Sequence, residues 1–92
     1  MKLVDAVREI ETLDEDLIIF IKDMADQDSN ILLSAGNENG RGAVLFQGVK
    51  YHYLIEVFLA REFVQALIED ANRELDYSTI AQRLFDYAVN DA

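Results

Sequence analysis

Residues 49–71 read VKYHYLIEVFLAREFVQALIEDA, and the spacing of their apolar side chains changes midway. From Val49 to Val57 every odd position is apolar, which is the period of two typical of a half-buried strand. From Ala60 to Leu75 apolar residues recur every three or four positions, which predicts one face of a helix. No glycine or proline marks the change, so a single helix that starts near Lys50 is the alternative.

The residues before this stretch predict one short helix and three strands. Apolar residues at positions 3, 6, 7 and 10 have helical spacing. Residues 17–21 are apolar on both faces, which is typical of an inner strand. We predict that residues 31–35 and 43–47 are antiparallel neighbours, because Asn39-Gly40 between them is favoured in tight hairpin turns.

The residues after this stretch predict a final helix, with apolar positions from Tyr77 to Ala88 on one face. Asp76, Ser78 and Thr79 are each suited to cap its start, and Thr79 has capping-box spacing to Gln82. The order of elements therefore predicts a single α+β domain over residues 1–92. It is an antiparallel sheet of about four strands with one N-terminal and two C-terminal helices packed on it.

The chain is strongly acidic, with 18 Asp and Glu, 8 Lys and Arg, and a net charge of −10 over 92 residues. Residues 1–30 carry −6 and residues 61–92 carry −4, whereas residues 31–60 are neutral. Nucleic-acid binding requires basic stripes, so this charge argues against it. A surplus of carboxylates keeps a small protein in solution, and it also suits a positively charged protein partner.

Two acidic clusters and two tyrosines are the candidate partner-binding residues. Because the clusters flank the strand at 17–21, we expect them at its opposite ends. Tyrosines on the neutral strand are core residues by default, and interface anchors if their face is exposed. The candidates are Asp14, Glu15, Asp16, Asp23, Asp26, Asp28, Tyr51 and Tyr53.

The composition disfavours an enzyme or a cofactor site. The chain has no cysteine and a single histidine, His52, so thiolate sites, histidine clusters and Cys–His pairs are excluded. No serine lies in a Gly-x-Ser-x-Gly elbow. The acidic run at 26–30 imitates the start of a calcium loop, but Ile31 stands where that loop needs glycine and Asn37 where it needs glutamate. We therefore expect no catalytic residue, cofactor or metal.

The sequence also predicts where the protein resides. Charges recur every few residues between Met1 and Ile10, which is unlike a signal peptide. The longest early apolar run, at 17–21, is far shorter than the roughly 20 residues that span a bilayer. We expect a cytoplasmic protein without a membrane segment.

Residues 56–63 (EVFLAREF) and the terminal helix that ends in residues 87–92 (YAVNDA) resemble small bacterial domains. Some of these domains are similar to immunity proteins of contact-dependent growth inhibition and related toxin systems. The resemblance covers about the C-terminal 40 residues, and it carries no diagnostic catalytic or metal motif, so no residue role is transferred. Such immunity proteins are small, often acidic, and bind a basic toxin domain, commonly a nuclease.

Together these observations predict a non-catalytic inhibitor that covers the basic active site of a toxin. The alternative is a structural or assembly module that acts as a homo-oligomer, for example a homodimer. The sequence leaves open the identity of the partner, the binding face and the oligomeric state.

Overall fold

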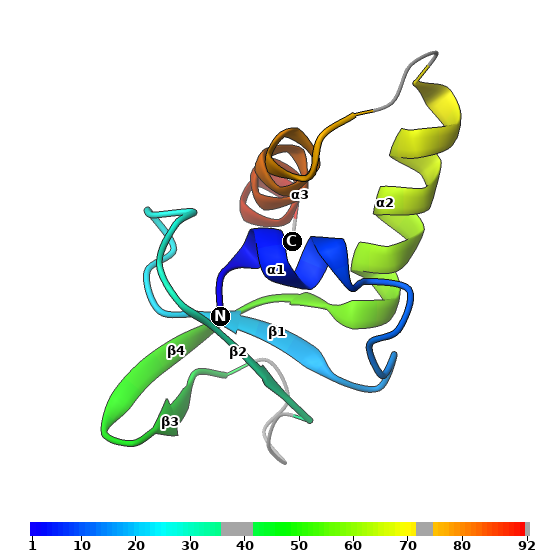
Figure 1. Cartoon of the computed structure of the whole chain (residues 1–92). Coiled ribbons are helices and arrows are strands. Elements are labelled where there is room, and N and C mark those ends of the chain that lie inside the picture. The colour runs from blue at the N-terminus through cyan, green and yellow to red at the C-terminus, as the bar shows by residue number, and fades with distance from the viewer. Residues whose placement is uncertain (36–41, 72–74, 92) are drawn as a thin grey trace.

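The computed structural model describes residues 1–35, 42–71 and 75–91 (Figure 1). Its elements follow in the order α1 (Leu3–Arg8), β1 (Ile18–Ile21), β2 (Ile31–Ser34), β3 (Val44–Phe46), β4 (Val49–Glu56), α2 (Val57–Asp70) and α3 (Tyr77–Asp91). The predicted α+β class is confirmed, with one N-terminal helix, a four-stranded antiparallel sheet and two C-terminal helices.

The sheet has the strand order β2-β1-β4-β3, and each neighbouring pair is antiparallel. β1 lies between β2 and β4, and Ile19, Phe20 and Ile21 are fully buried. This confirms residues 17–21 as an inner strand, since a strand covered on both faces needs apolar side chains in both directions. The register between β1 and β4 shifts after Ile19, where Leu54 forms a bulge.

The predicted pairing of residues 31–35 with residues 43–47 is wrong. β2 pairs with β1, and β3 instead forms a hairpin with β4. The reason is a two-residue turn at Gln47-Gly48, where φ is 51° and 78°, as type I′ turns require. The predicted turn at Asn39-Gly40 lies outside the described residues.

The change of period at residues 49–71 is a strand that continues directly into a helix. β4 ends at Glu56 and α2 begins at Val57, so the single-helix alternative is wrong. α2 starts three residues before the predicted Ala60, and the backbone N–H of its first residue, Val57, donates to the carbonyl of Leu17 at 2.9 Å. That hydrogen bond fixes the start of α2 beside the start of β1.

All three helices lie on the same side of the sheet, and α2 rises from the end of β4 (Figure 1). One apolar cluster joins buried residues of α1, α2 and α3 to Ile19, Ile21 and Leu54 of the sheet. Because side chains alternate along a strand, Phe20 points to the opposite face. There its ring meets the edge of Tyr53 at a centroid distance of 6.4 Å. The sheet is therefore apolar on both sides at its centre.

The two C-terminal helices are joined by side-chain packing and a cap. Phe63 of α2 stacks on Tyr87 of α3, with ring centroids 4.7 Å apart. Among the predicted caps, Asp76 is the one used, and its Oδ1 accepts the backbone N–H of Thr79 at 2.7 Å. That hydrogen bond lowers the pKa of the Asp76 carboxyl, because it stabilises the charged form. Ile68 of the predicted stripe remains 53% exposed.

Candidate interaction surface

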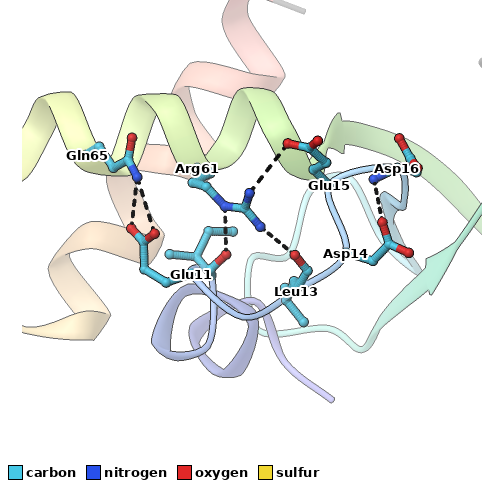
Figure 2. A network of polar contacts seen from close by, with 8 residues as sticks. Glu11, Leu13, Asp14, Glu15, Asp16, Arg61 and Gln65 are labelled. Carbon is cyan, nitrogen blue, oxygen red and sulfur yellow. Dashed lines mark hydrogen bonds and ion pairs between the residues drawn. The ribbon is translucent and has the colours of Figure 1, made fainter.

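The loop between α1 and β1 is held in place by one arginine of α2. Arg61 Nε donates to the backbone carbonyl of Ile10 at 3.1 Å, and its Nη2 donates to the carbonyl of Leu13. Its Nη1 lies 3.6 Å from Glu15 Oε2 (Figure 2). The Arg61 side chain is only 21% exposed, so the N–H donors of its guanidinium link the largely buried side of α2 to the loop. The loop therefore has a defined backbone course between Ile10 and Glu15.

Two further contacts fix the ends of the same loop. Gln65, one turn after Arg61, donates from Nε2 to both carboxylate oxygens of Glu11 at 3.1 and 3.3 Å. Asp14 Oδ1 accepts the backbone N–H of Asp16 at 2.9 Å, which is an Asx turn (Figure 2). These contacts involve the side chains of Glu11 and Asp14 and the backbone of Asp16. The result is an ordered loop whose three successive acids, residues 14–16, are all exposed.

Beside these acids lies a shallow hollow of about 200 Å³. Its lining combines carboxylates with apolar side chains: Glu15, Asp16, Leu17, Ile18, Glu56 and Phe58. Phe58, in the first turn of α2, is 42% exposed. At an interface with a basic partner, an exposed aromatic ring supplies contact area and neighbouring carboxylates supply complementary charge. We call residues 11–16 with Glu56 and Phe58 the acidic loop surface.

The second acidic cluster is in the turn between β1 and β2, and its carboxylates have local roles. Asp23 Oδ1 accepts the N–H of Ala25, and Asp26 Oδ1 accepts the N–H of Asp28, each at 2.9 Å. Lys2 Nζ donates to the backbone carbonyl of Asp28. Lys2 and Lys22 line the same hollow, of about 300 Å³, as Asp23, Asp26, Asp28, Ser29 and Asn30. Here two ammonium groups accompany three carboxylates, and the net charge is −1.

The two clusters lie at opposite ends of β1, in separate hollows, in agreement with the expected geometry. They differ in local charge. The acidic loop surface has five carboxylates, of Glu11, Asp14, Glu15, Asp16 and Glu56. With the guanidinium of Arg61 beneath it, the local net charge is −4. The electrostatic field of the acidic loop surface is therefore more strongly negative than that of the cluster between β1 and β2.

The two candidate tyrosines belong to β4 and point away from the helices. Tyr51 is 9% exposed, so it presents little surface to a partner in this conformation. Tyr53 is half-buried against Phe20. The aromatic residue with the greater exposure beside an acidic cluster is Phe58, which was not among the partner-binding residues predicted from the sequence. The alternation of apolar side chains identified the strand, but it did not show which face of the strand would be covered.

His52 lies on β4 opposite Ile21 and is half-buried. Within the described ranges, no three His, Cys, Asp or Glu side chains lie close enough together to hold a metal ion. None of the helices described here combines the length and the apolar content needed to cross a membrane.

Sequence reasoning also missed Arg61 and Gln65. Arg61 donates to carbonyls 48 and 51 residues earlier in the chain, and Gln65 reaches a carboxylate 54 residues earlier. Backbone carbonyls leave no trace in side-chain patterns, so no local motif could have identified this arginine. Comparisons with protein-family models, with curated proteins and with solved structures found no match for this chain.

Proposed function

We propose that this chain is a non-catalytic protein-binding domain that neutralises a basic protein partner through the acidic loop surface. The arrangement of an immunity protein that covers the active site of a nuclease-like toxin is the one it fits best. The single observation that carries the proposal is the loop at residues 14–16, whose three exposed carboxylates stand on a backbone held by Arg61.

Charge supports the choice of partner. A net charge of −10 creates a negative field around the molecule, which accelerates encounters with a positively charged protein. The active site of an enzyme that acts on nucleic acid is positively charged, since it must neutralise phosphates. A negatively charged surface of matching shape competes with the nucleic acid for that site.

Rigidity supports the choice of surface. Ordering a flexible loop on binding costs free energy, and a loop that is already ordered avoids that cost. Arg61 and Gln65 order the acidic loop in the unbound chain by contacts that leave Asp14 and Asp16 at the surface. Phe58 adds an apolar contact at the edge of the same surface.

The proposal is tested by affinity capture with the tagged chain from extracts of its source cell, at about 0.05 M and about 0.5 M NaCl. Charges exposed on two surfaces are screened over roughly 10 Å at 0.1 M salt. We expect a basic protein that is retained at low salt and released at high salt, and whose enzymatic activity falls when the purified chain is added in equal amount. Capture of the same proteins at both salt concentrations, none of them basic, would contradict the proposal.

A further inference from the structure

The tip of the β3–β4 hairpin exposes apolar side chains and lacks the carboxylates that are common elsewhere in the chain. β3 is one of the two edge strands of the described sheet, and its three residues, Val44–Phe46, carry no charge. Leu45 is 76% exposed and Phe46 is 46% exposed. Residues 42–55 contain no Asp or Glu and only one Lys, Lys50, in a chain whose net charge is −10. Edge strands commonly carry charged residues that prevent pairing with another chain, and β3 has none.

The turn geometry shows which backbone groups of β3 face outward. Gln47 and Gly48 form a two-residue turn, so Phe46 and Val49 on either side of it are a hydrogen-bonded pair. In an antiparallel ladder, hydrogen-bonded and non-hydrogen-bonded pairs alternate. Leu45 and Lys50 are therefore a non-hydrogen-bonded pair, and the N–H and C=O of Leu45 point away from β4.

We propose that β3 pairs in antiparallel fashion with β3 of a second copy of this chain, about a two-fold axis at Leu45. On such an axis the N–H of Leu45 donates to the carbonyl of Leu45 in the other copy, and the reverse hydrogen bond forms by symmetry. The two exposed Leu45 side chains then lie side by side on one face. On the other face Phe46 of each copy lies next to Val44 of the other, so both contacts are apolar.

The charge of the chain favours a second copy as the partner that pairs with β3. Two copies that each carry −10 repel wherever their acidic ends approach, and the stretch at residues 42–55 has no carboxylate to contribute. A basic partner gains no ion pair here, and it is attracted instead to the acidic loop surface. The inference therefore stands independently of the proposed function.

The short length of β3 limits the expected affinity of the dimer. A three-residue edge with two exposed apolar side chains buries less than the surface of a standard stable interface, so the dimer is weak and depends on concentration. We expect a dissociation constant between about 1 µM and about 1 mM. Because the copies repel each other, salt should tighten this dimer, whereas it should weaken the binding of a basic partner.

The first test is cysteine cross-linking, for which a chain without cysteine is well suited. Directly opposed residues of a hydrogen-bonded pair have Cα atoms about 5.5 Å apart, within the range that disulfides bridge. Under mild oxidation L45C should form covalent dimers at least ten-fold faster than the control I68C, whose parent residue is 53% exposed on α2. Equal rates for the two variants would overturn the proposal.

The second test is sedimentation equilibrium of the full chain at low and high salt. L45K should weaken the dimer at least ten-fold, while I68K should leave its dissociation constant within two-fold of the wild-type value, with folding of both variants checked by circular dichroism. A wild-type chain that stays monomeric at about 1 mM in 0.5 M NaCl, or an L45K chain that dimerises as tightly as wild type, would overturn the proposal.

Discussion

Arg61 of α2 donates from Nε to the backbone carbonyl of Ile10 at 3.1 Å, across 51 positions of the chain. The same guanidinium donates to the carbonyl of Leu13 and lies beside the Glu15 carboxylate. The conformation of the acidic loop is therefore determined by a helix from the other half of the sequence.

Replacing Arg61 should lower stability by more than its ion pair would suggest. R61A removes the donors to two partly buried carbonyls, and we expect a loss of about 1–3 kcal/mol in the free energy of unfolding. E15Q removes only the exposed ion pair, and should cost under about 1 kcal/mol. Urea denaturation measures both. Equal losses would show that the ion pair, and not the carbonyl contacts, holds the loop.

The position of the core predicts a contrast between two apolar residues of the C-terminal helices. Leu84 of α3 is fully buried, so L84A should lower the free energy of unfolding by about 2–5 kcal/mol through the cavity it leaves. I68A, at a position 53% exposed on α2, should cost under about 1 kcal/mol. Thermal or chemical denaturation of the two variants compares them directly, and the opposite ranking would contradict the described packing of α2 and α3.

The Gln47-Gly48 turn predicts a contrast between two glycines. Gly48 has a φ of 78°, which L-residues with a Cβ adopt at a cost, so G48A should lower stability by about 1–2 kcal/mol. At Gly42 an added Cβ meets no atom within 4 Å, and G42A should be neutral or slightly stabilising. Denaturation midpoints give the comparison. A harmless G48A would mean that the hairpin joins β3 and β4 by a different turn.

The cap of α3 predicts a dependence on pH. The hydrogen bond from the Thr79 N–H lowers the pKa of the Asp76 carboxyl, so the charged cap contributes stability above the ordinary pKa of about 3.9. That contribution is lost as the pH falls through the lowered pKa. The melting temperature of D76A should therefore lie furthest below wild type near pH 7, and the gap should shrink below about pH 4.

The matched control is D86A, which removes an exposed carboxylate from the middle of α3 and leaves the cap in place. Its melting temperature should follow that of wild type more closely at every pH. A gap for D76A that stays constant down to about pH 2 would show that the charge of the cap contributes nothing.

Much of this fold could be predicted because apolar periodicity reflects burial. The change from period two to period 3.6 located both β4 and α2, and the apolar run at 17–21 identified the inner strand. What periodicity does not contain is the identity of the neighbour of each strand. Asn39-Gly40 is the stronger turn motif, yet the described hairpin uses Gln47-Gly48, with a glutamine at positive φ that statistics disfavour.

The candidate site was predicted only in part, from the distribution of charged residues along the sequence. Charge counts placed acidic residues at both ends of β1, and the structure has them there. They did not distinguish the two clusters, because the difference depends on Lys2 and Lys22 near one and Arg61 and Phe58 near the other. Lys22 is a sequence neighbour of Asp23, but Lys2, Arg61 and Phe58 reach the clusters over long sequence distances, which one sequence does not reveal.

We propose that the acidic loop surface, and not the acidity of the whole chain, binds the basic partner. The variant D14N/E15Q/D16N removes three charges there, and the amide oxygen that replaces the carboxylate at position 14 can still accept the N–H of residue 16. The variant D23N/D26N/D28N removes the same three charges at the other end of β1 and likewise keeps an acceptor at positions 23 and 26. Both variants carry a net charge of −7, which is −10 plus the three charges removed.

The decisive measurement is the association rate constant of each variant with the captured partner, by stopped flow or surface plasmon resonance at about 0.05 M NaCl. We expect D14N/E15Q/D16N to slow association at least ten-fold and to flatten its salt dependence, whereas D23N/D26N/D28N should change the association rate constant by less than about three-fold. Equal slowing by the two variants, or no slowing by either, would contradict the claim and leave the carboxylates only a role in solubility.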